Sequence, residues 1–158
     1  IEDLAHIDTV VFDKTGTITE GRPYITQINC YNGYSDEEVL YKAAILEQTS
    51  SHPLAYAFLE EAKKRQLSLP DISVHNKVEV HTGKGLFGEA DGSLVHVGSL
   101  RYMQDEKITI DPQVVFEHAH SVYVAIDGHL AGAITIQDRI RDGMGVAIKS
   151  LKALGVKR

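Results

Sequence analysis

The sequence has little of several residue types that mark specialised classes of protein. Cys30 is the only cysteine, which excludes a disulfide within the chain and a thiolate metal cluster, and favours a reducing compartment. No apolar run approaches the roughly 18 residues that a membrane-crossing helix needs, and no signal-peptide pattern is present. Lys and Arg number 16 against 22 Asp and Glu, and the formal net charge of -6 argues against a nucleic-acid or anionic-membrane surface.

The remaining composition is that of an ordinary folded protein. The chain has 158 residues, of which 43% are hydrophobic and 24% are charged. These values are typical of globular rather than disordered proteins, and the length suits one domain or two small ones.

The first thirty residues predict two strands. Ile7–Phe12 is short, apolar and rich in β-branched residues, which indicates a strand buried in a parallel sheet. Asp13 would follow the carboxyl end of this strand, where open α/β sheets place their ligands. Gly21-Arg22-Pro23 indicates a break, and a second strand is expected over about 25–31.

Two helices and then an antiparallel sheet are expected in the middle of the chain. Ser35 to Glu38 has the form of a capping box before a helical apolar face, and Pro53 suits the first turn of a second helix. From Val78 onward, two Asp-Gly pairs are strong hairpin signals. The later elements predicted are hairpins of 86–90 with 94–98 and of 122–126 with 130–136, a short helix opened by Asp111-Pro112, and a last helix over about 142–154 closed by Gly155.

The order of these elements predicts the architecture. The ends of the chain, including a strand over about 131–136 and the last helix, have an α/β pattern, whereas the middle has an antiparallel pattern with helices. We therefore expect an α+β domain, an antiparallel sheet flanked by helices, inserted into an α/β Rossmann-like domain.

The most specific motif is the stretch Asp13–Thr19, DKTGTIT. A carboxylate at a strand end can attack a phosphoryl group and form an aspartyl-phosphate. Gly16 permits a tight turn, and Thr15 and Thr17 offer hydroxyls and backbone N–H groups to phosphate oxygens. The alternative for a bare Asp-x-Thr is an Asx-type turn with solvated threonines.

With its preceding phenylalanine, this stretch resembles the phosphorylation motif of the P-type ATPases, in the haloacid-dehalogenase-like superfamily. The resemblance implies that Asp13 is the phosphorylated nucleophile, with Lys14 and Thr15 beside it and Mg²⁺ partly held by Asp13 and Thr15. Phosphatases of the superfamily usually carry a second Asp where this chain has Thr15. The substitution should slow hydrolysis of a phosphoenzyme, which favours a pump over a phosphatase.

A second stretch, EQTSSHPL from Glu47 to Leu54, is similar to a signature of the heavy-metal-transporting branch, and Gly83-Lys84-Gly85 matches its Gly-x-Gly element. The resemblance implies that Glu47, His52, Gly83 and Gly85 contact adenine. Each element alone is weak: a histidine before a proline is more often structural, and the glycines alone indicate a turn.

Two further matches are less exact. Gly98-Ser99 stands where copper pumps often have Gly-Asn, so the resemblance implies nucleotide contacts at Gly98 and Ser99, with a shorter reach for the serine. Asp138 and Arg141 resemble an Asp-x-x-Arg element that contacts ATP phosphates or the interdomain hinge. The alternative is a helix N-cap at Asp138 with a solvated Arg141.

Other polar residues have ordinary interpretations. His118 and His120 could present two imidazoles on one strand face, but without companion ligands they are expected to be a surface pair. Lys84 could reach a phosphate or be solvated.

The resemblance implies that residues 1–22 are the first part of a phosphorylation domain and residues 132–158 its middle part, with the remainder of that domain missing. Residues 23–131 would be a nucleotide-binding domain between them. The parent would be an ATP-hydrolysing heavy-metal pump, and this chain a cytoplasmic domain of that integral membrane protein. Its ligands would be ATP and Mg²⁺, and its partners the remaining phosphorylation domain, the actuator domain and the transmembrane helices. The transported metal cation would bind elsewhere in the parent.

The resemblance also bears on what this chain can do without the rest of the parent. The chain alone is expected to bind nucleotide without efficient catalysis, and no nucleic-acid partner is expected. The alternatives are a haloacid-dehalogenase-type phosphatase with a cap domain and a non-catalytic nucleotide-binding module.

Overall fold

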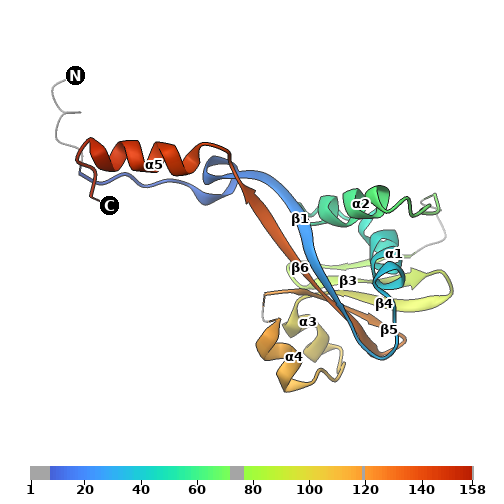
Figure 1. Ribbon diagram of the computed structural model, residues 1–158. Coiled ribbons are helices and arrows are strands. Elements are labelled where there is room, and N and C mark those ends of the chain that lie inside the picture. The colour runs from blue at the N-terminus through green and yellow to red at the C-terminus, as the bar shows by residue number, and fades with distance from the viewer. Residues whose placement is uncertain (1–7, 72–76, 119, 158) are drawn as a thin grey trace. The chain divides into compact units, whose positions relative to one another are not determined.

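The computed structural model describes residues 8–71, 77–118 and 120–157 (Figure 1). The chain forms two units: the continuous segment Pro23–Gln137, and a second unit that combines Ile1–Arg22 with Asp138–Arg158. Strands β1 (Thr19–Cys30) and β6 (His129–Ile140) contain the two boundaries. The chain thus passes between the units twice, each time within a strand.

The larger unit contains a six-stranded sheet in the order β1-β6-β5-β4-β3-β2. The pairs from β2 to β6 are all antiparallel. An antiparallel sheet is thus confirmed for the middle of the chain. β2 (Glu79–His81) is an edge strand, and β3 (Gly85–Ala90), β4 (Ser93–Gly98) and β5 (Val122–Ile126) lie inside the sheet.

Both predicted Asp-Gly hairpins are confirmed. Asp91 and Gly92 join β3 to β4, and Asp127 and Gly128 join β5 to β6. All four turn residues have positive φ, between 49° and 81°. Two-residue turns of this hand match the twist of the paired strands, and asparagine, aspartate and glycine adopt them most readily.

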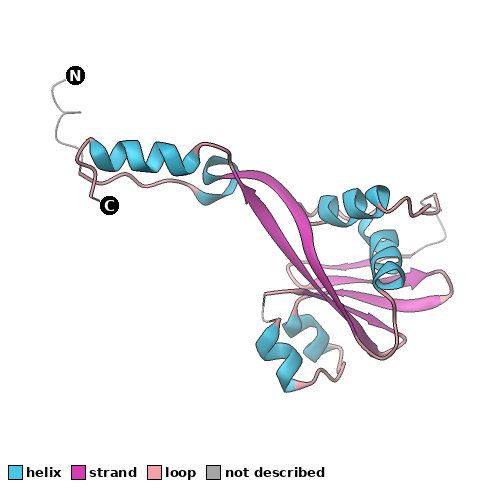
Figure 2. Cartoon of the chain, viewed as in Figure 1, coloured by secondary structure: helices cyan, strands magenta, loops and turns pink. Residues whose placement is uncertain are grey.

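Helices α1 (Asp36–Glu47) and α2 (Ala55–Lys64) pack on one face of the sheet (Figure 2). The predicted N-cap at Ser35 starts α1, where the Glu38 N–H donates to Ser35 Oγ at 3.2 Å; this is one of the two hydrogen bonds of the predicted capping box. Arg65 ties the end of α2 to the start of α1 through an ion pair with Asp36, at 2.6 Å. The buried residues that α1 contributes to this layer are Val39, Leu40, Ala43, Ala44, Ile45 and Leu46.

Helices α3 (Leu100–Asp105) and α4 (Pro112–Glu117) cover the other face (Figure 2). The predicted start of α4 is confirmed, since Asp111 Oδ1 accepts from the Gln113 N–H at 2.7 Å. Helix α3 was not predicted from the sequence. A second buried cluster lies beneath these helices and contains Tyr102, Met103, Ile108, Tyr123, Ala125, Leu130 and Ala133.

The smaller unit contains an irregular turn, η2 (Lys14–Ile18), the outer ends of β1 and β6, and helix α5 (Met144–Ala153). Gly143, with φ +84°, precedes α5. None of the α5 side chains is buried within the part of the chain that the structure describes. No helix in the described ranges is both long and apolar enough to cross a membrane.

The strand predicted over residues 7–12 is wrong in its described part. Residues 8–12 have no regular structure, and Val11 is 90% exposed; Ile7 lies outside the described residues. A strand is stabilised by hydrogen bonds to a neighbouring strand. No strand in the described ranges pairs with this segment, so its β-branched composition alone is not sufficient to make it a strand.

Several predicted boundaries also differ. Gly21-Arg22-Pro23 does not break the chain but lies within β1, where Gly21 has φ +69°. Pro53 lies in the turn before α2 and not in its first turn. The second boundary between the units falls at 137/138 and not at 131/132, because β6 pairs with β5 through Ile134. The assignment of the units as nucleotide-binding and phosphorylation domains stays a prediction.

Candidate functional site

A cavity of about 630 Å³ lies in the larger unit, at one end of the sheet. Its walls come from the start of β3, the end of β4 and the start of β5, together with the end of α1 and the first turns of α3. The lining mixes apolar side chains with a small number of polar groups, which is typical of small-molecule sites. The apolar lining includes Leu54, Val80, Leu86, Val97, Leu100 and Val122.

The six residues that the sequence assigned to nucleotide binding all line this one cavity. They come from three separate stretches of the chain, and folding brings them together. They are Glu47, His52, Gly83, Gly85, Gly98 and Ser99.

Glu47 is the last residue of α1, and it is only 6% exposed. Its Oε2 has no hydrogen-bond partner. Burial raises the pKa of this carboxyl to about 7, and a hydrogen bond with Ser50 opposes part of the shift. A buried acceptor without a partner is uncommon in folded proteins, and here the residue that carries it is one of those that line the cavity.

His52 lies in the turn between α1 and α2 and is exposed. The Leu54 N–H donates to His52 Nδ1 at 3.2 Å, and the His52 N–H donates to Ser50 Oγ at 3.2 Å. Since Nδ1 accepts a hydrogen bond, the neutral ring carries its proton on Nε2. The free Nε2–H and the ring face are therefore available to a ligand.

Gly85 and Gly98 face each other across β3 and β4. A Cβ added to Gly85 would lie 2.5 Å from Tyr102 Cδ1, and one added to Gly98 would lie 2.6 Å from the same atom. Both glycines are therefore required by the packing of the Tyr102 ring, a reason that the sequence did not reveal. Gly83 is favoured for a different reason: a Cβ added there would have no atom within 4 Å, but its φ of +71° is one that other residues rarely adopt.

Ser99 is the N-cap of α3. Its Oγ accepts from the Tyr102 N–H at 3.2 Å, and its backbone N–H donates to the Lys84 carbonyl at 3.0 Å. The hydroxyl hydrogen stays available to a ligand, while the oxygen is already used to cap the helix.

The predicted catalytic residues belong to the smaller unit. Asp13, Lys14 and Thr15 are exposed, and Gly16 has φ +81° in the turn that follows Asp13. The described ranges hold no cluster of three or more His, Cys, Asp or Glu side chains arranged for a metal. The Asp13 carboxylate and oxygens of Thr15 suit Mg²⁺, which often takes one or two carboxylates together with phosphate and water oxygens.

Asp138 and Arg141 make hydrogen bonds to the turn that follows Asp13 and to the residues just after it. Asp138 lies within β6 and not at a helix N-cap; its Oδ2 accepts from the Thr19 hydroxyl at 2.5 Å and its Oδ1 from the Arg22 N–H at 3.0 Å. Arg141 Nη2 donates to the Gly16 carbonyl at 2.9 Å. The two residues therefore fix the backbone that follows Asp13.

Sequence reasoning missed several residues in or beside the cavity, and for Lys84 it left open a phosphate contact or a solvated side chain. Tyr102 lies beneath the glycine pair, and His81 leans on its ring with 5.2 Å between ring centroids. Lys84 makes an ion pair with Asp105 at 2.8 Å. The alternation of polar and apolar residue types in β2 could have placed His81 on one face of a strand, but three residues are too short to give a clear pattern. The lining residues not assigned from the sequence include His81, Lys84, Arg101, Gln104, His120 and Ser121.

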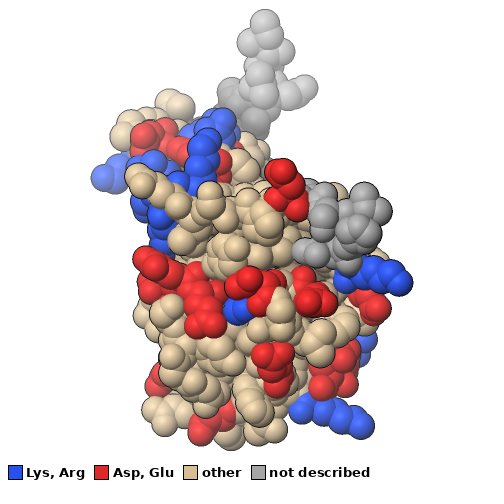
Figure 3. Space-filling model, turned by 90° about the vertical axis from the view of Figure 1, so that its right-hand side faces the viewer, with Lys and Arg blue, Asp and Glu red and all other residues tan. Residues whose placement is uncertain are grey.

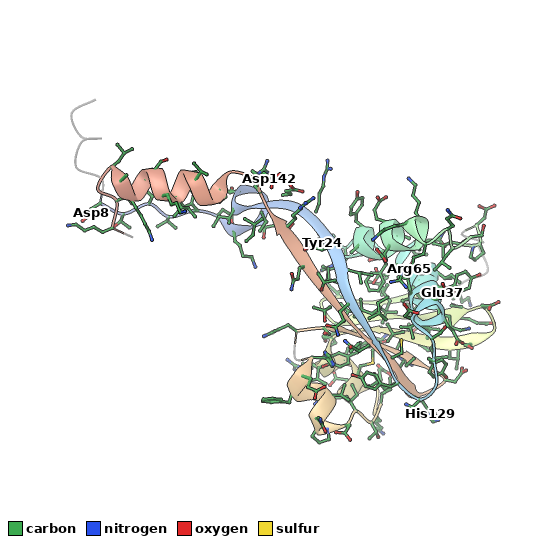
Figure 4. All side chains as sticks on the ribbon, in the orientation of Figure 1. Asp8, Tyr24, Glu37, Arg65, His129 and Asp142 are labelled. Carbon is green, nitrogen blue, oxygen red and sulfur yellow. The ribbon has the colours of Figure 1, made fainter. Side chains whose placement is uncertain are left out.

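Charged side chains are distributed unevenly over the surface (Figure 3). On the face shown in Figure 3, acidic side chains are widespread and Lys and Arg lie mostly near its edges. His129, labelled in Figure 4, lies at the opposite end of β5 from the cavity residue Val122.

Comparison with known proteins gives the same family. The family model described as haloacid dehalogenase-like hydrolase matches residues 7–158. The silver exporting P-type ATPase of Salmonella typhimurium is 35% identical over 163 residues, which cover 99% of this chain and 19% of that protein. The chain thus spans about a fifth of the length of this relative.

Two solved structures are also similar. A crystal structure of a zinc-transporting PIB-type ATPase in the E2.Pi state has a TM-score of 0.75 and 33% identity, covering 99% of this chain and 26% of that one. The catalytic domain of the CPx-ATPase CopB-B, studied upon nucleotide binding, has a TM-score of 0.72 and 27% identity, covering 99% of this chain and 54% of that one.

The family match covers almost the whole chain, and the relatives and structures agree on one branch of it. The chain belongs to the haloacid dehalogenase-like hydrolase family and is similar, over nearly its full length, to part of the heavy-metal P-type ATPases.

Proposed function

We propose that the segment Pro23–Gln137 binds the adenine nucleotide of a heavy-metal P-type ATPase. The observation that carries this proposal is the buried carboxyl of the cavity residue Glu47, whose Oε2 lacks a hydrogen-bond partner. The exocyclic amine of adenine is a donor that suits this acceptor. The His52 ring, held by its Nδ1 hydrogen bond, can stack on the base or donate from Nε2.

The phosphate end of the nucleotide requires positive charge and N–H donors. Lys84 and Arg101 line the same cavity, and Ser99 offers its hydroxyl. Lys84 is already paired with Asp105, so nucleotide phosphates would compete with that carboxylate. The cavity therefore combines an acceptor for the base with cationic side chains for phosphates.

In the intact parent, Asp13 would receive the γ-phosphoryl group of ATP. A carboxylate oxygen of Asp13 forms the new bond to phosphorus, the bond from phosphorus to the bridging oxygen breaks, and ADP leaves. Mg²⁺ would neutralise charge on the phosphates, held partly by Asp13 and Thr15. Asp138 and Arg141 would contribute by fixing the turn at Gly16.

The proposal extends to the whole parent. The larger unit would be a nucleotide-binding domain inserted into an α/β phosphorylation domain, on the cytoplasmic side of an integral membrane protein. The remaining phosphorylation domain, the actuator domain and the transmembrane helices would complete the pump. The parent would couple hydrolysis to transport of a heavy-metal cation, and similarity to both silver and zinc pumps leaves the metal open.

Nucleotide binding can be tested on this chain by NMR titration with ATP. We expect backbone shifts around residues 47–52 and 80–101, and about tenfold weaker binding in His52→Ala and Glu47→Ala. Equal shifts and affinities in the native chain and both variants would contradict the proposal.

Phosphorylation needs the longer parent. Radiolabelled ATP should label the intact pump and not its Asp13→Asn variant. Steady turnover of small phosphomonoesters by the parent, without a stable phosphoenzyme, would support a phosphatase instead.

A further inference from the structure

A row of four residues crosses the sheet beside the cavity. His81 on β2 pairs with Gly85 on β3, Gly85 pairs with Gly98 on β4, and Gly98 pairs with Tyr123 on β5. Directly paired residues of antiparallel strands present their side chains on the same face. The two glycines therefore leave a gap in this row between the side chains of His81 and Tyr123.

The ring of Tyr102 fills that gap. Its Cδ1 lies 2.5 Å from the position that a Cβ of Gly85 would take and 2.6 Å from that of Gly98, and the residue is fully buried. Its hydroxyl lies 3.2 Å from His96 Nδ1. Packing and the hydrogen bond together fix the orientation of the ring.

The His81 ring packs against the Tyr102 ring. The two ring centroids are 5.2 Å apart with an angle of 43° between the planes. Glu79 Oε2 lies 3.9 Å from His81 Nε2. The His81 side chain keeps 36% of its surface exposed and lines the cavity. A fixed aromatic support beneath a partly exposed imidazole is a preorganised arrangement for stacking.

We propose that His81 stacks on the purine base in the cavity, as a second base-contacting imidazole beside His52. This inference rests on the proposed function, because it needs a nucleotide in the cavity. Base contact is favoured over phosphate contact because the His81 ring packs on the Tyr102 ring, whereas Lys84 and Arg101 in the same lining supply cations for the phosphates. Tyr102 acts as a positioning residue that orients the imidazole.

The test compares affinities for AMP and ATP by NMR or calorimetric titration of the whole chain. His81→Ala should weaken both nucleotides about tenfold, because stacking is lost whatever the number of phosphates. His81→Phe keeps an aromatic face and should bind within about threefold of the native chain. His129→Ala, an exposed histidine at the far end of β5, is the matched control and should bind normally.

The outcomes separate this inference from the proposed function. If His52→Ala and Glu47→Ala weaken binding but His81→Ala does not, only the role of His81 is overturned. A loss in His81→Ala confined to ATP, or no rescue by His81→Phe, also overturns stacking on the base. If no variant changes affinity, the proposed nucleotide site itself is wrong.

Discussion

At the scale of single residues, the Glu47 carboxyl combines burial with an unsatisfied oxygen. Such a group destabilises the apo fold when it is ionised, because charge in a buried site loses its hydration. A ligand donor would relieve this penalty. The same residue is therefore expected to govern both nucleotide affinity and the pH dependence of stability.

Glu47→Gln should remove a fall in stability between about pH 5 and 8. The pKa of Glu47 is raised to about 7 in the fold, above its unfolded value of 4.5, so the fold binds the proton more tightly. The stabilisation is complete below the unfolded pKa and is lost as pH rises through the folded pKa. The native chain should lose about 2–3 kcal/mol relative to Glu47→Gln over this range.

Urea unfolding at several pH values measures this difference. Glu60→Gln on the exposed surface of α2 is the control and should follow the native curve. Parallel curves for the native chain and Glu47→Gln would show that the carboxyl titrates as an exposed one.

Gly98→Ala should destabilise the fold by about 2 kcal/mol or more. The added Cβ would lie 2.6 Å from the Lys84 carbonyl oxygen and 2.8 Å from Gly85 Cα, and backbone atoms cannot rotate away. Gly92→Ala is a contrasting variant: no atom lies within 4 Å of its Cβ, so its effect would come from its φ of +73° alone. Thermal unfolding compares the two, and a smaller loss for Gly98→Ala than for Gly92→Ala would contradict the steric argument.

Residue chemistry explains which site residues could be predicted. Glu47, His52 and the glycines stand in recognisable motifs, and the fold brings all of them to one cavity. Tyr102 and His81 could not be predicted, because their importance depends on cross-strand register and on a ring that fills the space beside two glycines. A sequence lists residue types but does not state which strands pair.

At the scale of elements, short sequence patterns predicted the structure correctly where the conformational preferences of adjacent residues determine it. Both Asp-Gly hairpins and the cap at Ser35 form as predicted, since these depend on conformational preferences of a few adjacent residues. The strand predicted over residues 7–12 did not form in its described part, because a strand depends on a distant partner. Helix α3 is too short for a periodic pattern.

Ser35→Ala should destabilise the larger unit by about 1 kcal/mol. The Ser35 hydroxyl accepts from the Glu38 N–H at the start of α1, and the apolar side of α1 is buried on the sheet. Loss of the cap should therefore weaken the whole unit and not merely fray one turn. Ser35→Asp keeps an acceptor and should retain native stability, as measured by urea unfolding. Equal losses for both variants would show that the hydrogen bond is not responsible.

At the scale of the whole molecule, the two units differ in how much buried core the described residues give to each. Both buried clusters of the larger unit lie between Val39 and Ile134, and its cavity residues lie between Glu47 and Val122. The smaller unit has an α5 without buried side chains in the described ranges. An inserted domain is expected to keep its own core, whereas an interrupted host domain needs all of its parts.

The segment 23–137, expressed alone, should therefore fold and bind ATP with an affinity within about threefold of the whole chain. Circular dichroism and an NMR spectrum report its folding, and titration reports its affinity. His52→Ala in the short segment should weaken binding about tenfold, as in the whole chain, if the same cavity is used. An unfolded segment would mean that residues 8–22 and 138–157 supply stability to the larger unit, which would contradict its interpretation as an inserted domain. A folded segment that no longer binds ATP would instead place part of the nucleotide site outside the cavity that Glu47 and His52 line.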